Sequence, residues 1–209
     1  MMRIVLCTGN PGKVAELGSL LPDHIDLAGL REMDMPLDLP ETGETLEANA
    51  MQKARYVFER TGLPCIADDS GLEIEALGGR PGVHSARFAG PHKSTVDNNA
   101  KVLQELAGSV NRNARMRTII AFKDLDLEWY FEGTLNGRMT EGESGTNGFG
   151  YDPIFIPDGY DRTLAEMTLR QKNSISHRSI AIGKFLVAVK DRYGDLNIMD
   201  REHGSGSRA

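Results

Sequence analysis

The stretch CIADDSGL, residues 65–72, places two carboxylates directly after a short apolar run. The apolar run predicts a buried strand, and Asp68 and Asp69 are expected at the end of that strand. Two explanations fit this pair. The aspartates can simply open a turn, since Asp hydrogen-bonds neighbouring backbone groups. Alternatively, they share a site with a cation, which offsets the cost of burying charge.

Helical and strand patterns alternate on both sides of this stretch. Helices are expected where apolar residues recur three and four positions apart, over about 13–21, 46–58, 95–106 and 174–190. Strands are expected over the short apolar or alternating runs 3–8, 65–69, 72–77, 116–122 and 127–135, the last two as a hairpin. The mixture predicts an α/β fold, a mixed sheet with helices packed on it. The Gly- and Pro-rich loop 78–92 is the expected crossing point between two lobes around a central cleft.

Length and charge limit the possible functions. The chain has 209 residues, and we expect one domain of two lobes over 1–199, followed by a polar, disordered tail at 200–209. A net charge of -6 argues against a nucleic-acid polymer as partner. No apolar run approaches the roughly 18 residues of a membrane span, and the N-terminal run is too short for a secretory signal, so we expect a cytoplasmic protein. Cys7 and Cys65 are expected to be buried thiols.

The segment TGNPGK, residues 8–13, follows the first predicted strand and opens the first predicted helix. Backbone N–H groups at such a junction bind anions, and Lys13 adds a positive charge for phosphate oxygens. The spacing differs from that of a Walker A motif. The alternative is a plain strand-to-helix turn.

Carboxylates and further cations suggest a metal–phosphate site. Glu41 lies shortly before the helix at 46–58, together with Glu44 and Glu47, where acidic residues are also explained by the helix dipole alone. Mg²⁺ in phosphate enzymes is held by one or two carboxylates together with substrate phosphates. The further cations that such a site would use are Lys53, Lys172 and Arg178.

Two later segments suggest a pocket for a nucleobase. In GFGYDPIF, residues 148–155, Phe149 lies between glycines that can expose its ring for stacking, although a core aromatic is equally consistent. In KNSISHRS, residues 172–179, His177 and Arg178 can donate to a purine 6-oxo group and reject adenine, or they can be ordinary polar residues of a first helical turn.

These motifs together resemble one known family, the inosine triphosphate pyrophosphatases. The resemblance extends from about Ile4 to Val189 and rests on TGNPGK, ETGETLEANAMQKA, ADDSGL, PGVHSARFAG, GTNGFGYDPIF and SHR, in the order of that family. It implies Mg²⁺-dependent hydrolysis of ITP, dITP and XTP to the monophosphate and pyrophosphate, by homodimers with an elongated mixed sheet. His84, Cys7 and the hairpin turn KDLDL depart from the usual pattern.

The same resemblance implies roles for individual residues. Asp69 matches the catalytic carboxylate and a metal ligand, Glu41 assists with the metal, and Ser70 touches the substrate. The residues implied to hold the triphosphate are Thr8, Gly9, Asn10, Pro11, Gly12, Lys13, Lys53 and Lys172. Those implied to form the nucleoside pocket are Phe149, Gly150, Tyr151, Asp152, His177 and Arg178.

Two other functions fit part of the pattern. A nucleotide sensor without turnover would keep the cations and the aromatic ring, but the presence of both Asp69 and Glu41 argues against it. A hydrolase of the septum-inhibitor type would act on modified pyrimidine nucleotides, whereas the SHR segment favours purines. From the residues themselves, water is expected to attack the α-phosphorus with Asp69 as general base.

Overall fold

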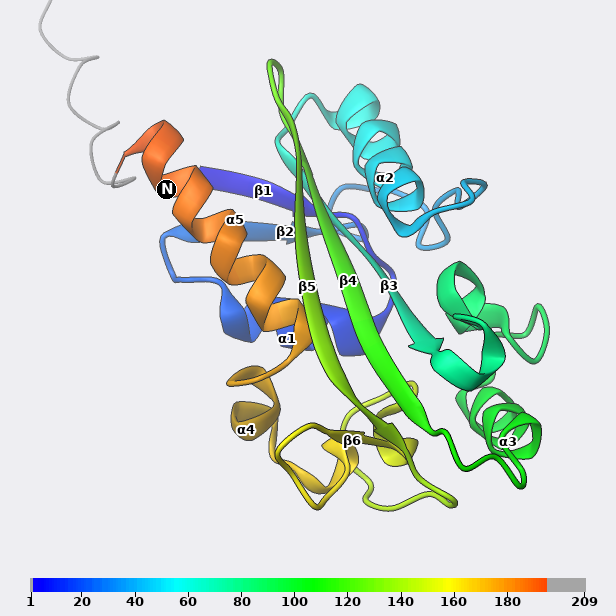
Figure 1. Cartoon of the computed structure of the whole chain (residues 1–209). Coiled ribbons are helices and arrows are strands. Elements are labelled where there is room, and N and C mark those ends of the chain that lie inside the picture. Colours follow the sequence, from blue (N-terminus) through cyan, green and yellow to red (C-terminus); the bar gives the residue numbers. More distant parts are fainter. Residues whose placement is uncertain (1, 195–209) are drawn as a thin grey trace, which may run out of the picture.

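A six-stranded mixed sheet runs through the computed structural model, which describes residues 2–194 (Figure 1). Its strands lie in the order β2-β1-β3-β4-β5-β6. Their bounds are β1 Met2–Leu6, β2 Ile25–Gly29, β3 Cys65–Ile74, β4 Asn113–Lys123, β5 Glu128–Met139 and β6 Phe155–Pro157. β1 pairs in parallel with β2 and β3, whereas the remaining pairs are antiparallel. The predicted mixed α/β sheet is confirmed.

Helices cover both faces of this sheet. The α-helices are α1 Pro11–Leu20, α2 Leu46–Thr61, α3 Thr95–Glu105, α4 Leu169–Asn173 and α5 His177–Tyr193, and the 3-10 helices are η1 Glu75–Leu77, η2 Gly82–Arg87, η3 Asp152–Ile154 and η4 Leu164–Glu166. Hydroxyl side chains begin four of the α-helices, since Thr45, Ser94, Thr168 and Ser176 each accept a bond from a backbone N–H of the first turn. No helix in the described part of the chain is both long and apolar enough to cross a bilayer.

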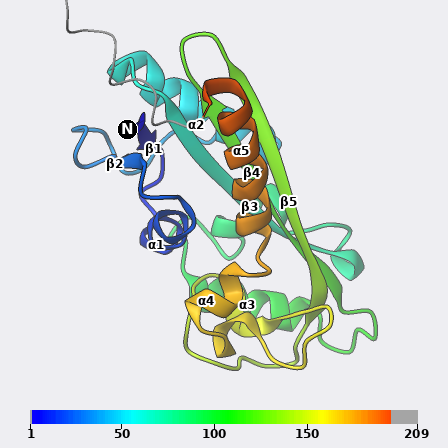
Figure 2. The ribbon, with the colours of Figure 1, turned by 90° about the vertical axis from the view of Figure 1, so that its left-hand side faces the viewer.

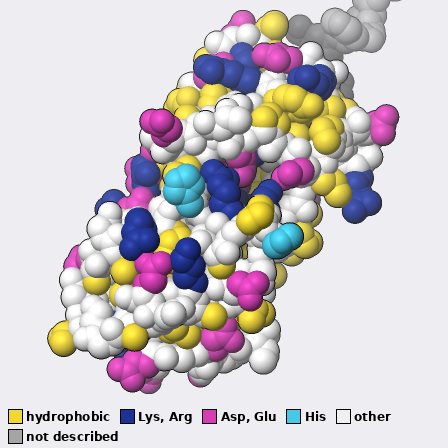
Figure 3. All heavy atoms as spheres, turned by 90° about the vertical axis from the view of Figure 1, so that its right-hand side faces the viewer, with side chains coloured by type: hydrophobic (Ala, Val, Ile, Leu, Met, Phe, Trp, Pro, Cys, Tyr) yellow, Lys and Arg dark blue, Asp and Glu magenta, His cyan; other side chains and the backbone are white. Residues whose placement is uncertain are grey.

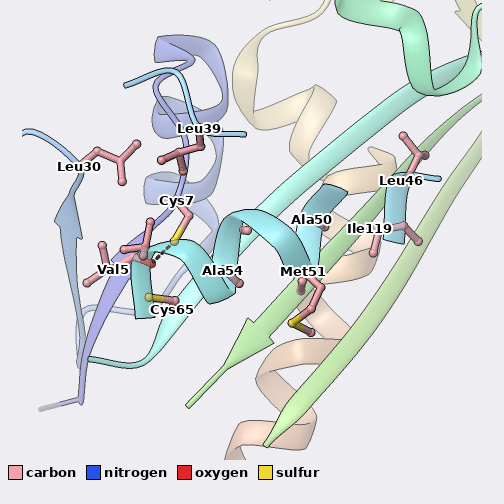
Figure 4. Packing of buried hydrophobic residues seen from close by; sticks show 13 residues of the cluster. Val5, Cys7, Leu30, Leu39, Leu46, Ala50, Met51, Ala54, Cys65 and Ile119 are labelled. Atoms are coloured by element: carbon pink, nitrogen blue, oxygen red, sulfur yellow. Dashed lines mark hydrogen bonds between the residues drawn. The ribbon is translucent and has the colours of Figure 1, made fainter. Parts of the chain in front are cut away.

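The alternation of side chains along β3 and β4 builds two cores, one on each face. Cys65, Ala67 and Ile119 face α2, where they pack with Ala50 and Ala54 among others (Figure 4). Ile66, Ile120 and Phe122 face the opposite way and pack with residues of α1 and α5 such as Leu17 and Phe185. Both cysteines are free and buried, as predicted.

A third core lies at the other end of the sheet. Leu72, Ile74 and Met116 pack there against Val102 and Leu106 at α3 and against the segment that contains β6 and η4. Figures 1 and 2 show α3, α4 and β6 gathered at this end, while the long β4–β5 hairpin continues to the end that carries α2. We call the end with β1, β2, α1, α2 and most of α5 the first lobe, and the end with η2, α3, β6 and α4 the second lobe.

Several sequence predictions need correction. Asp68 and Asp69 do not end a strand: β3 continues without a break to Ile74 and includes the first half of the strand expected at 72–77, whose second half forms η1. The loop 78–92 does not join the lobes alone, because it folds into η2 against β3, and the strands β3 to β5 span both lobes. Val14 and Val96 are apolar residues inside the helices predicted at 13–21 and 95–106, where they would be expected on the buried face, but they are 42% and 69% exposed.

Some elements were missed because their patterns are short. The strands β2 and β6 contain only five and three residues and show no clear alternation of apolar and polar residues. The last helix, expected from residue 174, begins at His177 because Ser176 caps it, and the residues before it form the separate helix α4. The domain boundary predicted at residue 199 and the tail at 200–209 lie outside the described residues.

Candidate active site

The site lies where β1 ends and β3 continues. β1 pairs with β3 only at Val5–Cys65 and Leu6–Ile66, after which the chain turns into the segment 8–13. Beyond that point, within residues 2–194, no strand pairs with β3 on the β1 side and only an isolated bridge joins Glu73 to Pro81, which leaves carbonyl groups of β3 available. The carbonyl of Asp68 accepts from two lysines instead of a strand, at 2.8 Å from Lys53 Nζ and 3.3 Å from Lys13 Nζ.

Because successive side chains of a strand point to opposite faces, the two aspartates enter different surroundings. Asp69 points to the α2 face, where its Oδ1 lies 3.1 Å from Lys53 Nζ. Asp68 points to the α5 face, where Arg178 Nε donates to its Oδ2 at 2.8 Å and Lys13 pairs with its Oδ1. Asp68 is fully buried, and Asp69 is 7% exposed.

The electrostatic surroundings separate the two acids further. Burial raises the pKa of Asp69 above its usual value, although the Lys53 and Lys13 charges oppose that rise. For Asp68, burial also acts upward, but the charges of Arg178 and Lys13 prevail and hold its pKa well below the usual range. Asp68 is therefore a fixed negative charge, whereas Asp69 is the member of the pair better suited to accept a proton.

The segment Thr8–Lys13 forms a capped helix start. Asn10 caps α1, and its side-chain oxygen accepts from the backbone N–H groups of Gly12 at 2.9 Å and Lys13 at 3.2 Å. The Asn10 N–H in turn donates to Thr8 Oγ1 at 3.2 Å. The loop is thus held by its own side chains, and its strongest positive group for an anion is the ammonium of Lys13.

The ring of Phe149 lies against this loop. A Cβ on Gly12 would approach Phe149 Cδ1 to 2.4 Å, so only glycine at that position lets the ring lie there. Lys172 Nζ and Arg178 Cζ lie 4.7 Å and 5.5 Å from the ring centroid. Asp152 fixes the turn, because its Oδ2 accepts from the Phe149 N–H at 2.8 Å and pairs with Lys172.

His177 and Arg178 sit at the start of α5, which docks directly on β5. A Cβ on Gly133 of β5 would lie 1.8 Å from the His177 carbonyl oxygen, so a glycine is required for this close approach. The Arg178 nitrogens donate to Asp68 at 2.8 Å, to Ser70 at 3.1 Å and to Glu16. The Arg178 guanidinium therefore links α5 to β3 and α1.

His177 is buried and neutral. Burial, followed by the charges of Arg178 and Lys172, lowers its pKa well below the usual value. Its Nδ1 is one of the few buried side-chain nitrogen or oxygen atoms that have no hydrogen-bond partner in the described part of the chain. A buried polar atom without a partner is unusual, and the residue that carries it lies beside a cavity.

The structure brings every predicted site residue to the wall of one cavity of about 610 Å³ between the lobes. The residues that line this cavity include the whole segment Thr8–Lys13, the two carboxylates Glu41 and Asp69, and Lys53, Ser70, Phe149, Gly150, Tyr151, Asp152, Lys172, His177 and Arg178. Figure 3, seen from the side of α2 and α3, shows Lys and Arg side chains at the waist between the two lobes.

The carboxylates fit a magnesium ion only in combination with a substrate. Glu41 and Asp69 both contact the ammonium of Lys53, at 2.7 Å and 3.1 Å, so their oxygens converge on one point. Within the described residues, no three His, Cys, Asp or Glu side chains converge to form a complete metal site. Two carboxylates plus phosphate oxygens are the donor set that Mg²⁺ takes in nucleotide enzymes. The donor chemistry fits.

Comparison with known proteins identifies the family. The model of the Ham1 family matches residues 4–188. The chain belongs to the Ham1 family. A dITP/XTP pyrophosphatase of Flavobacterium johnsoniae is 43% identical over 185 residues, which cover 88% of this chain and 96% of the relative. The dITP/XTP pyrophosphatase of Porphyromonas gingivalis is 44% identical over 195 residues, which cover 91% and 100%.

A solved structure agrees with this assignment. The structure of a HAM1 protein from Coxiella burnetii superposes with a TM-score of 0.83 at 38% identity, covering 91% of this chain and all of that one. The resemblance drawn from the sequence motifs is confirmed, and so is the α/β fold of a Ham1 protein.

One residue of this Ham1 chain was missed by the sequence analysis. Glu16 of α1 is 2% exposed and pairs with Arg178 and, at 2.6 Å, with Lys172. Its only signal is its place next to Leu17 on the apolar side of α1, where a charge needs a buried partner. It links α1 to both α4 and α5.

Proposed function

We propose that this Ham1-family chain hydrolyses non-canonical purine nucleoside triphosphates, ITP, dITP and XTP, to the monophosphate and pyrophosphate. The observation that supports this most directly is that Asp69 and Glu41 converge beside Lys13, Lys53 and the Phe149 ring in a single cavity. The names of the similar proteins, dITP/XTP pyrophosphatases, point to the same reaction.

In this reaction Asp69 is the general base. Its raised pKa suits proton transfer from a water molecule that attacks the α-phosphorus. Magnesium, held by Glu41, Asp69 and phosphate oxygens, would supply neutralisation of charge on the phosphates. Asp68 does not share this role, because its carboxylate is bound to Arg178 and Lys13 and has no exposed surface. Catalysis then rests on positioning and electrostatics, as is general for phosphoryl transfer.

The remaining cations and the capped loop would bind the triphosphate. Residues Thr8–Lys13 and Lys53 line the cavity on the first-lobe side, and Ser70 lies next to Asp69. Lys172 is held between Glu16 and Asp152, so its charge is largely balanced within the protein. We assign Lys13 and Lys53 the larger share of phosphate binding, since Lys53 contacts Glu41 and Asp69, which would hold the metal, and Lys13 donates to the same Asp68 carbonyl as Lys53.

The nucleoside would occupy the side of the cavity formed by Phe149–Asp152, His177 and Arg178. The part-buried Phe149 ring offers a face for stacking. The imidazole of His177, which lines the cavity, would supply the polar contact to the purine, and a 6-oxo group can accept from its N–H. A 6-amino group would present a donor to that donor, which leaves buried polar groups unpaired and rejects adenine.

A nucleotide panel tests the proposal. ITP, dITP, XTP, ATP, GTP, dTTP and UTP are incubated with the enzyme and Mg²⁺, and pyrophosphate, orthophosphate and monophosphate are measured separately. We expect equal amounts of pyrophosphate and monophosphate from ITP, dITP and XTP and slow turnover of the others. Release of orthophosphate, preference for a pyrimidine nucleotide, or binding without turnover would each refute it.

We further infer that residues 1–199 act as one catalytic domain, in a homodimer, in the cytoplasm, on free nucleotides rather than on a nucleic-acid polymer or at a membrane. The resemblance to the family supports the homodimer, and the net charge of -6 supports the free nucleotide. Light scattering of the purified chain tests the assembly. Turnover by a chain ending at residue 199 tests the domain boundary.

A further inference from the structure

Arg87 ends a row of alternating charges that starts at the catalytic aspartate. Asp69 Oδ1 lies 3.1 Å from Lys53 Nζ, which lies 2.7 Å from Glu41 Oε1. Glu41 Oε2 in turn lies 3.8 Å from Arg87 Nη1. Glu41 and Lys53 belong to the first lobe, whereas Arg87 belongs to η2 of the second lobe. It therefore approaches the metal-binding carboxylate from across the cleft.

The guanidinium of Arg87 is the least satisfied group in this row. Its contact with Glu41 is longer than a hydrogen bond, and in the described part of the chain none of its N–H groups donates to a partner. The side chain is 33% exposed, against 6% for Lys53. By contrast, the neighbouring Lys93 is already paired with Asp38 at 2.7 Å.

Arg87 lines an open hollow that adjoins the main cavity. The hollow also includes Tyr56, Lys93 and Asp38, and it shares Glu41 with the nucleotide cavity. A group bound to Glu41 through a metal would thus have Arg87 on its outer side, away from the Phe149 ring. In the proposed reaction the distal phosphates are the part of the substrate farthest from the nucleobase that stacks on Phe149.

The backbone around Arg87 is firmly held, so only its side chain has freedom to move. Ser85 Oγ accepts from the Leu72 N–H of β3 at 2.8 Å, and the Ser85 carbonyl accepts from the Tyr151 hydroxyl at 2.7 Å. On the other side of Arg87, Asn98 Oδ1 accepts from the Ala89 N–H at 2.7 Å. These bonds hold the backbone of Arg87 beside β3 near Leu72, in the same part of the strand as Asp69.

Electrostatic interactions determine which group the Arg87 guanidinium contacts once the metal and the nucleotide are bound. A divalent cation on Glu41 repels a guanidinium that approaches the same carboxylate. Phosphate oxygens are the partners that best match its planar set of donors, often through two parallel bonds. We propose, on the basis of the function proposed above, that Arg87 leaves Glu41 on binding of the metal–nucleotide and donates to the distal phosphates, so that the hollow is a subsite for the pyrophosphate product.

The test compares Arg87→Ala and Arg87→Lys with Arg80→Ala as a matched control. Arg80 also carries an exposed ion pair in the second lobe, with Glu105 at 2.9 Å, and lines neither cavity. Titration calorimetry measures the affinity of each protein for inorganic pyrophosphate with Mg²⁺ and, separately, for inosine monophosphate. Thermal unfolding checks that each variant is folded.

We expect Arg87→Ala to weaken pyrophosphate binding about tenfold or more, the effect of losing hydrogen bonds to a charged group. Its affinity for the monophosphate should stay within about twofold, and KM for ITP should rise more than kcat falls. Arg87→Lys should recover part of the loss, because it keeps the charge without the planar donors. Arg80→Ala should match the wild type.

Unchanged pyrophosphate affinity in Arg87→Ala, an equal loss of monophosphate affinity, or an equal loss in Arg80→Ala would each overturn the assignment. If Arg87→Ala does not fold, Arg87→Lys decides by the same comparison. These results are distinct from failure of the proposed function, which would appear in the wild type as release of orthophosphate or absence of turnover.

Discussion

Asp68 and Asp69 are adjacent in β3, yet their carboxylates lie on opposite faces of the sheet and pair with different cations. Asp69 meets Lys53 of α2, while Asp68 meets Arg178 of α5 and Lys13 of α1. The strand is the device that separates them, because its side chains alternate at every residue. One carboxylate thus anchors the elements around the site, and its neighbour faces the reaction.

The first prediction concerns Asp69, the carboxylate that lines the cavity. Asp69→Asn should lower kcat for ITP by about 10² to 10⁴-fold, the contribution expected of a general base, while nucleotide binding persists. Pyrophosphate release gives kcat, and calorimetry gives the affinity. Asp126→Asn, which changes an exposed aspartate of the β4–β5 turn, serves as the control. Turnover near the wild-type rate would assign the base to another residue.

The second prediction concerns Asp68, the carboxylate that links the elements around the site. Asp68→Asn removes the buried counter-charge of Lys13 and one of the two carboxylates that pair with Arg178, which keeps Glu16. Loss of one partner of a buried ion pair costs about 3 to 5 kcal/mol. The free energy of unfolding, measured in urea, should fall by this amount. Asp38→Asn breaks an exposed pair with Lys93 and should cost less than about 1 kcal/mol. Equal losses in the two variants would contradict the anchoring role of Asp68.

The residues of the candidate site can be picked out from the sequence because they belong to compact local motifs. The anion loop at 8–13, the carboxylates at 68–69 and the pair at 177–178 each lie on a predicted junction or helix start, and the structure brings all of them except Asp68 to the wall of one cavity. Their roles were harder to predict. The alternation that sends Asp68 away from the cavity depends on β3 continuing to Ile74, whereas the sequence suggested that the strand ends at the aspartates.

Groups that act only through distant partners left little local signal. Glu16 looks like one surface acid of α1 until α5 brings Arg178 against it. Likewise, nothing in the segment 78–92 shows that Arg87 approaches Glu41, because that contact depends on how η2 packs on β3. Pairings of this kind arise from tertiary packing and not from periodicity or turn chemistry.

The third prediction concerns pH. Burial lowers the pKa of His177, so the unfolded chain, with a histidine pKa of about 6.5, binds a proton in acid that the folded chain does not. The free energy of unfolding should therefore fall as pH drops below about 6.5, with a slope of up to about 1.4 kcal/mol per pH unit from this group. His177→Gln should remove that part of the slope, measured by urea unfolding between pH 7.5 and 5.5.

The control for this pH effect is His92→Gln, since His92 is exposed. It should keep the wild-type slope. A His177→Gln variant whose slope equals that of the wild type would show that the folded protein accepts the proton, contrary to a buried neutral imidazole.

The fourth prediction uses two glycines of α1 that differ only in what surrounds them. At Gly12 the backbone is ordinary, but a Cβ would meet the Phe149 ring at 2.4 Å, whereas at Gly18 no heavy atom lies within 4 Å. Gly12→Ala should displace the ring and weaken its stacking on the base, which is worth about 1 to 3 kcal/mol, so KM for ITP should rise about tenfold or more. Gly18→Ala should leave KM unchanged and raise stability by about 0.5 to 1 kcal/mol, because alanine favours the helix. Steady-state kinetics and urea unfolding of both variants measure these effects. If both variants keep the wild-type KM, the Phe149 ring does not form the wall against which the base stacks.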